Sequence, residues 1–486
     1  MKDGKAPGED GITTEMLKIL EEFTIDKLTD LFNDIYNTGY LPEELAKSVY
    51  IPLPKKAKAV ECGDHRTISL MPHVTKLLLK VIQERISHKV NKEIGETQFG
   101  FKPQSGTREA IFCLNHITQK HLQNNRKVYA CFIDYAKAFD RVHHVEIINC
   151  LEKAGIDGKD IRLITNLYWH QKAAIKIQGE VSTYTNIKRG VRQGCVLSPY
   201  LFNLYTEFIF RETENISGVK IGGKKLNNLR YADDTVLLAE NQADLQNITS
   251  QVKDNSEKMG LNMNVKKTKV MVMSRTPVED GKIVIDGEAL EEVTSFKYLG
   301  QNITTDGKTD DEIKTRIAVA RLRFSELSNI LTSQSTQLGT RIRLLKCYVH
   351  SVLLYGSETW TITKTSERKI KAFEMWTYRR MARISWKERK TNKEVCDALG
   401  LETNLLKEMK SRKLKYFGHV KRHTTILKEV MEGKVDGKRA RGRPPRQWLD
   451  DIREWTGKSA KECTDLARDR NEWRSITSRP LPGDGT

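Results

Sequence analysis

Two short acidic segments carry the residue types that metal-assisted phosphate chemistry requires. Tyr231-Ala232-Asp233-Asp234 lies between two apolar runs, and this pattern predicts a strand, a tight turn and a second strand over residues 226–239. Asp134 lies near the end of another apolar run, 128–135, which predicts a strand buried on both faces. Adjacent carboxylates repel each other, and a hard divalent cation relieves that repulsion. An acidic turn alone is also typical of a solvated loop, so the second acidic strand end is what favours a metal site.

The three carboxylates of Asp134, Asp233 and Asp234 would converge if the strand and the hairpin were neighbours in one sheet. Three carboxylates are the smallest set that we expect to hold two Mg²⁺ ions for in-line phosphoryl transfer, with Mn²⁺ as an alternative ion. The main-chain carbonyl of Tyr135 would add an oxygen ligand. We expect Asp134 and Asp233 to be the primary ligands and Asp234 to support them. For Asp134 alone, the competing interpretation is a turn residue at a strand end.

Other residues are candidates for contacts to a nucleotide. A bulky ring at Phe139 would clash with a 2′-hydroxyl and so select deoxynucleotides, although core packing explains a phenylalanine equally well. The polar loop 190–194 lets the backbone approach a base pair or sugar, and Gln193 and Gly194 lie in it. Arg66 and Lys55 are candidates for binding a triphosphate, with a plain surface charge as the alternative.

The elements that must position these residues divide the chain into four parts. Residues 1–125 mix helices with a short strand at 49–54, and the helices include 74–90 and 108–124. Residues 126–303 carry the strands, a helix that begins at Ser198-Pro199 and another at 242–259. Residues 304–400 are predicted to be helical, and Thr309 to Glu312 has the spacing of a capping box. Residues 401–486 form a basic appendix.

The composition points to a polyanionic partner. The 486 residues carry a formal net charge of +19, and nucleic acid is a more natural partner for that excess than a membrane. No stretch is long and apolar enough to span a bilayer. The eight cysteines are scattered without a C-x-x-C pair, which favours a reducing, intracellular setting; we expect the nucleus and cytoplasm. The chain starts abruptly on a turn at 5–12, so we expect a fragment of a longer protein.

Taken together, the motifs resemble those of a reverse transcriptase of the non-LTR, LINE-like retrotransposon group. The match covers roughly residues 1–400, and its ordered motifs are the segments 5–12, 65–70, 98–101 with 106–107, 132–140, 192–194 with 198–199, 231–234, 260–268 and 296–300.

The resemblance implies an α+β right-hand polymerase. Its fingers would be residues 1–125, its palm with an antiparallel sheet 126–303, its helical thumb 304–400, and its basic C-terminal nucleic-acid-binding region 401–486. By the same resemblance Lys267 would donate a proton to pyrophosphate, and Phe296, Tyr298, Leu299 and Gly300 would form the primer grip. The implied partners are an RNA template, a DNA primer or target and dNTPs, with no membrane; the oligomeric state stays open.

Two departures bear on activity. His65 and Thr67 replace the Tyr and Pro usual around Arg66, and Lys102, Gln104 and Ser105 stand where an R-x-G-R-G-T run is common. No segment matches the N-terminal endonuclease that some relatives carry. All three aspartates are intact, so we expect an RNA-directed DNA polymerase working by target-primed reverse transcription. The departures favour the alternative of a non-catalytic nucleic-acid-binding relic or co-opted scaffold, and an RNA-dependent RNA polymerase is a third possibility.

The appendix concentrates positive charge. Residues 405–446 hold 14 Lys or Arg against 4 Asp or Glu, and the arginines predicted to bind nucleic acid are Arg439, Arg441, Arg443 and Arg446. An Arg-Gly-Arg segment fits a narrow A·T minor groove, and phosphate contact or a solvated linker are the alternatives. Trp448 and Trp455 either stack on bases or form the core of a small helical unit.

Overall fold

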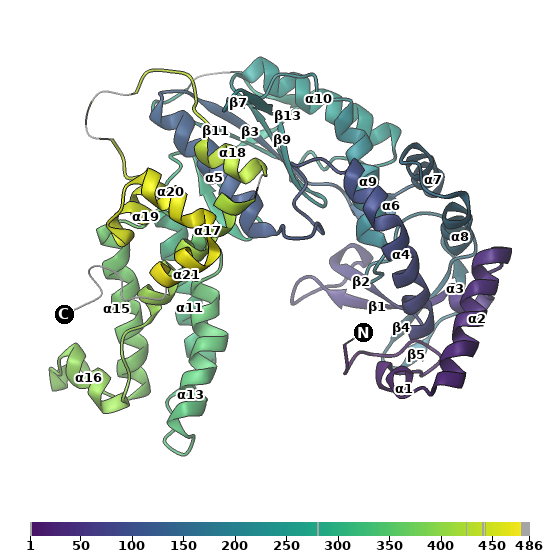
Figure 1. Ribbon diagram of the computed structural model, residues 1–486, viewed down its shortest axis with the longest axis horizontal. Helices are drawn as coiled ribbons and strands as arrows, with labels where there is room; N and C mark the ends of the chain where they lie inside the picture. Colours follow the sequence, from purple (N-terminus) through teal and green to yellow (C-terminus); the bar gives the residue numbers. More distant parts are fainter. Residues whose placement is uncertain (1, 279–280, 424, 440–441, 443, 478–486) are drawn as a thin grey trace.

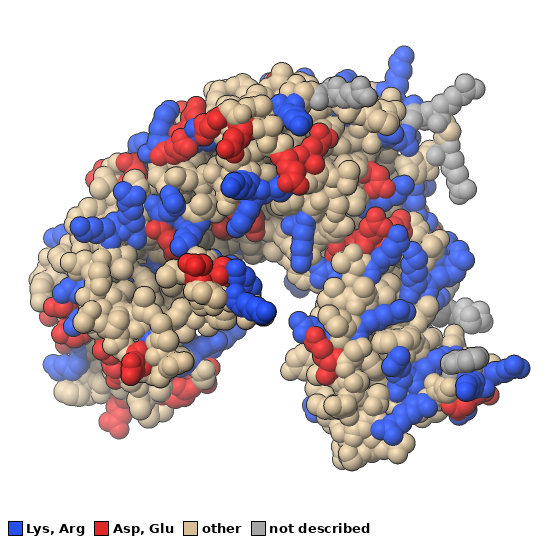
Figure 2. Space-filling view, turned by 180° about the vertical axis from the view of Figure 1, so that it is seen from behind, with Lys and Arg blue, Asp and Glu red and all other residues tan. Residues whose placement is uncertain are grey.

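The chain forms an arch in which a central sheet lies between two arms (Figure 1). The structure, a computed structural model, describes residues 2–278, 281–423, 425–439, 442 and 444–477. The space-filling view shows a deep open notch between the arms, with Lys and Arg side chains on both sides of it (Figure 2). Within the part of the chain that is described, no helix is long and apolar enough to cross a membrane.

The central sheet is the palm, and its strands run in the order β14-β11-β3-β10-β9. Their bounds are β3 (Val128–Ile133), β9 (Asn228–Tyr231), β10 (Asp234–Ala239), β11 (Lys269–Met273) and β14 (Glu291–Glu292). Every residue of β3 is buried, because alternate side chains enter two different cores. Val128, Ala130 and Phe132 pack in the core shared with the thumb, and Tyr129, Cys131 and Ile133 in the core of the opposite face.

Helices and short hairpins surround the palm sheet. The helices are α5 (Thr107–Gln123), α6 (Ala138–Arg141), α7 (His144–Lys153), α8 (Gly158–Trp169), α9 (Ser198–Arg211) and α10 (Gln242–Lys258). The hairpins are β7 (Val219–Ile221) with β8 (Lys224–Leu226), β12 (Val284–Ile285) with β13 (Glu288–Ala289), and β15 (Ser295–Tyr298) with β16 (Gln301–Thr304). The helices predicted at 108–124 and 242–259 are confirmed. The helix predicted to begin at Ser198-Pro199 is also confirmed, although its N-cap residue is Leu197 and not Ser198.

The fingers arm is built on a second sheet of five strands. Its path is β2-β1-β4-β5, with β6 also on β4. The bounds are β1 (Lys47–Pro54), β2 (His65–Leu70), β4 (Lys172–Ile177), β5 (Glu180–Val181) and β6 (Thr185–Asn186), with helices α1 (Thr14–Lys18), α2 (Glu22–Thr38), α3 (Glu43–Ala46) and α4 (His73–Glu93). The predicted strand at 49–54 and helix at 74–90 are confirmed. Because β1 pairs with β4, this sheet joins strands from either side of the predicted boundary at residue 125.

The thumb and the C-terminal region form the other arm. The thumb contains α11 (Asp310–Glu326), α12 (Ser328–Leu331), α13 (Leu338–Leu344), a π-helical turn (Leu345–His350), α14 (Ser351–Leu353), α15 (Lys364–Met381) and α16 (Asn392–Leu399). The C-terminal region contains α17 (Leu405–Arg422), α18 (Ile426–Glu432), α19 (Trp448–Thr456), α20 (Ala460–Arg468) and α21 (Arg470–Thr477). The thumb is helical, as predicted, and the described part of the C-terminal region is helical as well.

The capping box predicted at the start of α11 does not form. Thr309 is the N-cap residue, but its side chain makes no capping hydrogen bond and donates instead to the carbonyl of Thr361 at 3.1 Å. The carboxylate of Glu312 accepts from the N–H of Asn302 and from Arg316. Both side chains are thus drawn into tertiary contacts that the local spacing does not reveal.

Candidate active site

The three predicted carboxylates lie at one end of the palm sheet. β10 pairs with β3 so that Thr235 lies opposite Ile133, and the adjoining residues at that end are Asp234 and Asp134. The β9–β10 hairpin closes on the pair Tyr231 and Asp234, which leaves Asp233 in the turn itself. The register therefore produces the convergence that the sequence predicted, although metal binding by these residues stays a prediction.

The carboxylates disfavour one another's charge. Burial and the negative charge of Asp134 raise the pKa of Asp233, against the opposing effects of its own N–H and of Arg66. Partial desolvation by the surrounding protein, together with the charges of Asp233 and Asp134, raises the pKa of Asp234 to about 6, although this residue remains exposed to solvent. A nearby cation would relieve this repulsion.

The three carboxylates lie at the same end of the sheet, but their side chains are not arranged as a metal-binding group. Among the residues that the structure describes, no group of three or more His, Cys, Asp or Glu side chains is arranged to hold a metal ion. The chemistry of the donors nevertheless fits a hard divalent ion, since all are oxygens and their charges repel.

Lys267 lies beside Asp134. Its ammonium nitrogen is 3.7 Å from a carboxylate oxygen of Asp134, and 68% of its side chain is exposed. The loop that carries it is fixed to the end of β3, because the N–H of Asn264 donates to the carbonyl of Asp134 at 2.7 Å and the N–H of Asp134 donates to the hydroxyl of Thr268. This position is compatible with the proton-donor role that the resemblance implies for Lys267, and that role stays a prediction.

Tyr135 contributes a buried side chain next to the site. Its hydroxyl is 2.8 Å from that of Ser256 on α10, and burial raises its pKa to about 12. The aromatic ring therefore anchors the chain where β3 ends, and only the main chain of Tyr135 remains as a candidate metal ligand.

The predicted nucleotide-binding residues come from two elements that face the carboxylates. The positive charge of Arg66 on β2 lowers the pKa of Asp233, so this exposed guanidinium lies on the active-site side of the fingers. Lys55 donates from its ammonium to the carbonyl of Gly63 at 3.1 Å, and its charge lowers the pKa of Asp140, which burial raises overall.

The loop 192–194 lies against β2. The N–H of Ser69 donates to the carbonyl of Gln193 at 2.8 Å, and Gly194 has φ +104° with so little space that an added Cβ would lie 3.2 Å from the carbonyl of Ser69. Arg192 is buried and donates to the carbonyl of Ala46, so it is a structural residue. This packing places Gln193 and Gly194 next to β2, the strand that also carries Arg66.

Phe139 is half-buried at the edge of the site. Its ring stacks on that of Phe202 with centroids 4.3 Å apart and meets Phe101 edge-on at 6.5 Å. The ring is therefore held rigidly with part of its surface free, which is compatible with both interpretations of this residue.

The predicted primer grip is the β15–β16 hairpin. Phe296 stacks on Phe132 of β3 at 4.2 Å, and Tyr298 is buried, so these two residues anchor the hairpin. Leu299 and Gly300 form its tip, with φ +46° and +80°. The sequence missed the residues that hold this tip to the thumb: the hydroxyl of Tyr355 donates to the carbonyl of Leu299 at 2.8 Å, and the guanidinium of Arg316 donates to that of Gly300. No local pattern marks such contacts between distant segments.

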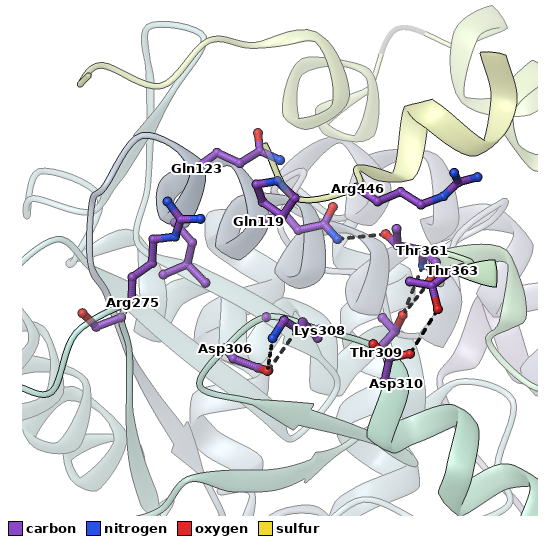
Figure 3. Close-up of a pocket in the computed structure, with 14 residues that line it drawn as sticks. Gln119, Gln123, Arg275, Asp306, Lys308, Thr309, Asp310, Thr361, Thr363 and Arg446 are labelled. Carbon is purple, nitrogen blue, oxygen red and sulfur yellow. Dashed lines mark hydrogen bonds and ion pairs between the residues drawn. The ribbon is translucent and has the colours of Figure 1, made fainter. Parts of the chain in front are cut away.

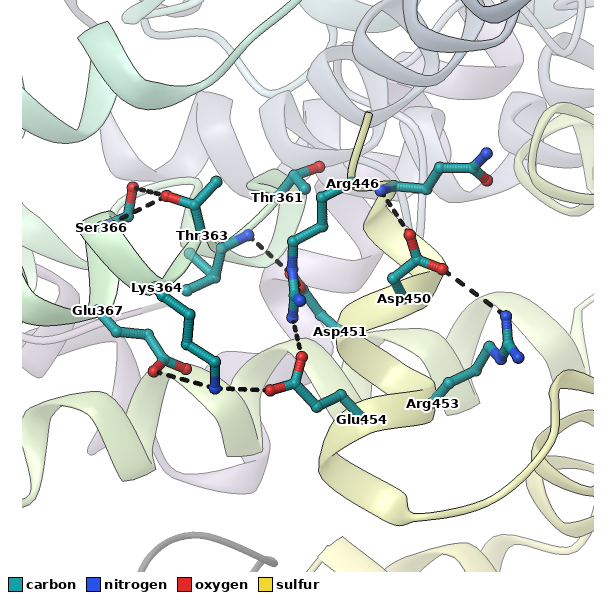
Figure 4. Close-up of polar contacts among 12 residues, drawn as sticks. Thr361, Thr363, Lys364, Ser366, Glu367, Arg446, Asp450, Asp451, Arg453 and Glu454 are labelled. Carbon is teal, nitrogen blue, oxygen red and sulfur yellow. Dashed lines mark hydrogen bonds and ion pairs between the residues drawn. The ribbon is translucent and has the colours of Figure 1, made fainter. Parts of the chain in front are cut away.

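One arginine of the basic tail is paired within the protein, and the predicted contact of the tail with nucleic acid stays a prediction. Arg446 contacts Asp451 and Glu454 at 2.7 and 2.6 Å, in a network that continues to Lys364 of the thumb (Figure 4). Arg439 is exposed, while Arg441 and Arg443 lie outside the described residues. Trp448 and Trp455 are buried, which supports their alternative interpretation as core residues.

Arg446 also lines a cavity of about 390 Å³ between the palm and the thumb (Figure 3). Gln119 of α5, Arg275 after β11, and Lys308 before α11 line it as well. None of the three carboxylates lines it, so this cavity is not the candidate active site.

Comparison with known proteins identifies the family. Residues 53–303 match the model of the family described as reverse transcriptase (RNA-dependent DNA polymerase). This chain belongs to the reverse transcriptase family. The match ends with β16, so it includes the carboxylates, Arg66 and the predicted primer grip. Members of this family generally use divalent metal ions.

Similar proteins come from mobile elements. An RNA-directed DNA polymerase from the mobile element jockey of Drosophila funebris is 25% identical over 408 residues, which are 82% of this chain and 44% of that protein. The Pol polyprotein of the type-2 retrotransposable element R2DM of Drosophila melanogaster is 28% identical over 62% of this chain and 29% of its own length. The chain thus spans less than half the length of these two relatives. Apo telomerase from Candida tropicalis covers 86% of this chain and 74% of its own at 11% identity and a TM-score of 0.42.

Proposed function

We propose that this chain is an RNA-directed DNA polymerase that extends a DNA 3′-hydroxyl on an RNA template, as in target-primed reverse transcription of a retrotransposon. The observation that carries the proposal is the strand register that gathers Asp134, Asp233 and Asp234 at one end of the palm sheet. Membership of the reverse transcriptase family and the similarity to an RNA-directed DNA polymerase and a Pol polyprotein of mobile elements support it. A non-catalytic scaffold would not need three mutually repelling carboxylates.

The proposed metal ligands are Asp134, Asp233 and Asp234, with the carbonyl of Tyr135. When bound there, two Mg²⁺ ions would neutralise charge on the triphosphate and lower the pKa of the attacking hydroxyl. The protein's part is to hold its oxygen donors at the ends of paired strands, where their backbone is fixed by the sheet.

The fingers and palm side chains would bind the dNTP. Arg66 and Lys55 would hold the triphosphate, and Gln193 and Gly194 would contact the incoming base pair or sugar. Phe139 would lie beneath the sugar and exclude a 2′-hydroxyl.

On the opposite side of the carboxylates, Lys267 would donate its ammonium proton to the departing pyrophosphate. Its distance from Asp134 supports a role close to the leaving group. The β15–β16 hairpin, fixed at its tip to the thumb, would hold the primer end.

Primer extension tests the proposal. We expect the full chain to extend oligo(dT) on poly(rA) with dTTP and Mg²⁺, and Asp233→Asn to reduce the rate by at least about 10²-fold. Asp254→Asn, which changes an exposed aspartate of α10 outside the site, is the matched control and should keep the rate. A folded wild-type chain that binds RNA but does not extend the primer would overturn the proposal, as would an equal loss in both variants.

A further inference from the structure

A short segment of the fingers–palm junction lies directly against the catalytic turn. Residues 97–99 pair with the edge strand β9: the N–H of Arg230 donates to the carbonyl of Thr97, and the N–H of Phe99 donates to the carbonyl of Arg230, both at 2.8 Å. This pairing continues the palm sheet by one short stretch. It delivers the fully buried side chain of Gln98 to the turn between β9 and β10.

The amide oxygen of Gln98 is held by two main-chain donors. It accepts from the N–H of Gly100 at 2.9 Å and from the N–H of Ala232 at 3.1 Å. Since both partners can only donate, the oxygen and not the nitrogen of the amide must face them. The nitrogen of the same amide is buried without a hydrogen-bond partner, so this orientation is kept at a cost.

Ala232 is the residue of the turn that most needs such a contact. It has φ +57°, whereas Asp233 is not among the residues with positive φ. A positive φ at the first central residue alone is the sign pattern of a II′ turn, in which glycine is normally required there. Alanine in this region is strained, because its Cβ crowds the backbone there. The hydrogen bond from Gln98 therefore supports a backbone conformation that the alanine does not favour.

Gly100 and Phe101, which follow this segment, also pack against the turn. A Cβ added at Gly100 would lie 2.5 Å from the nitrogen of Ala232, so only glycine allows this approach. The carbonyl of Gly100 accepts from the side chain of Asn203 on α9 at 2.7 Å, and the ring of Phe101 lies 6.4 Å from that of Tyr231. The turn is thus bounded on this side by a rigid, buried surface.

We infer that Gln98 is a positioning residue of the active site: by accepting from Ala232, it fixes the turn that carries Asp233 and Asp234. Gln98 touches neither substrate nor metal in this role, and acts only through the main chain of the turn. The kinetic part of the inference rests on the proposed polymerase function, whereas its structural part does not.

Two measurements on the full chain test the inference: hydrogen exchange at Ala232, without added nucleotide or metal, and primer-extension kinetics. In Gln98→Met the side chain keeps its length but loses the acceptor, and we expect the amide of Ala232 to exchange its hydrogen at least about 10-fold faster. We expect kcat for primer extension to fall at least about 10-fold while KM for dTTP stays within about twofold, because the turn orients the proposed metal ligands, whereas the side chains proposed to bind the dNTP lie on other segments.

Gln171→Met is the matched control. Gln171 is also buried, and its side chain makes one hydrogen bond, to Tyr50, far from the turn. Both measurements should stay at the wild-type value in this variant. If Gln98→Met does not fold, Gln98→Asn withdraws the same acceptor by one methylene and should give the same two changes.

The outcomes separate the two proposals. Unchanged exchange at Ala232 in a folded Gln98 variant overturns the inference, whatever the activity. Faster exchange in a chain whose wild type does not polymerise supports the positioning contact and overturns the proposed function. Equal changes in the Gln98 and Gln171 variants assign the effect to general destabilisation and overturn the inference.

Discussion

Phe139 has two interpretations, exclusion of a 2′-hydroxyl and core packing, and one experiment separates them. Its ring is held by Phe202 and Phe101 and retains free surface near the acidic cluster. If it excludes a 2′-hydroxyl, Phe139→Val should raise the ratio of rNTP to dNTP incorporation by about 10- to 100-fold, the range expected when a steric contact of about 1–3 kcal/mol is removed. The measurement is single-nucleotide extension with rUTP and dTTP on poly(rA).

The control for this prediction is Phe208→Val. Phe208 lies on the same helix as Phe202, but its ring contacts Lys153 and Arg211. An unchanged preference in Phe139→Val would assign Phe139 to core packing alone. A similar change in both variants would mean that the preference responds to any loosening of α9.

His350, a buried histidine of the thumb, makes the stability of the fold depend on pH. Burial lowers its pKa from 6.5 to about 4, with the charge of Lys346 acting in the same direction and that of Glu408 opposing it. The folded state therefore binds fewer protons than the unfolded state between these values. Its contribution to stability is complete above pH 6.5 and is lost as the pH falls toward 4.

We expect this one group to lower the free energy of unfolding by about 2 kcal/mol between pH 7 and pH 5. His350→Phe, which keeps a buried ring without a titrating nitrogen, should reduce the loss by that amount in urea denaturation at the two pH values. A variant whose stability falls with pH as steeply as that of the wild type would contradict the assignment.

The sequence predicted residues well where the chemistry itself dictates the residue type. The convergence of the three carboxylates is such a case, because few other side chains serve that chemistry. Where charge alone was the signal, pairing within the chain was missed: Arg446, which was expected to bind nucleic acid, is paired with Asp451 and Glu454. A count of arginines does not say whether a carboxylate elsewhere in the chain already neutralises them.

At the scale of elements, α17 shows the same difference between charge and exposure. The helix is strongly basic, yet Lys410, Lys413 and Lys421 are buried. The ammonium of Lys413 lies between the rings of Trp448 and Trp455 and donates to Asp451 and to the carbonyl of Trp360. Burial lowers the pKa of Lys413 to about 8, against the opposing effect of Asp451. This face of the helix is therefore an internal interface with α19 and with the thumb segment that carries Trp360.

Removing the aspartate of this pair should lower the free energy of unfolding more than removing the lysine. Asp451→Asn leaves a buried ammonium without its counter-ion and should lower the free energy of unfolding by about 3–5 kcal/mol. Lys413→Met should cost less, about 1–2 kcal/mol, because Asp451 keeps Arg446 and the N–H of Ile362. Chemical denaturation of both variants measures the difference, and an equal or reversed order would contradict this account.

Elements were predictable from sequence where one pattern determines them. The buried run of β3 and the period of α4, α5 and α10 gave the right type and nearly the right bounds. The capping box at Thr309 failed, because its side chain bonds to Thr361 instead. The contact of Gln98 with the catalytic turn also had no signal, since it joins residues 134 positions apart. Local rules describe what a segment can do alone and omit what distant segments offer it.

At the scale of the whole molecule, the C-terminal region returns to the palm and does not extend as an appendix. Lys120 of α5 donates to the carbonyls of Met431 and Gly433, and the N–H of Gly222 donates to the carbonyl of Lys434. The same region is bonded to the thumb through Asp451 and Ile362. The chain thus ties thumb and palm together on the side of the arch away from the fingers (Figure 1).

Trp448 lies where the palm, the thumb and the C-terminal region meet. Its ring packs edge-on against Phe112 of α5 at 5.2 Å and near Phe417 of α17, and its indole N–H donates to the carbonyl of Glu358 at 2.8 Å. Trp448→Ala removes contacts to the palm, the thumb and the C-terminal region at once, and should lower the free energy of unfolding by about 3–5 kcal/mol.

The effect should also reach beyond the helix that carries Trp448. Because the three parts share one core, hydrogen exchange should accelerate in α5 and at 357–359 as well as in α19. Trp169→Ala, which truncates a half-exposed tryptophan at the end of α8, is the matched control and should cost less than about 1 kcal/mol. Faster exchange confined to α19 would mean that the C-terminal region unfolds independently and does not tie the thumb to the palm.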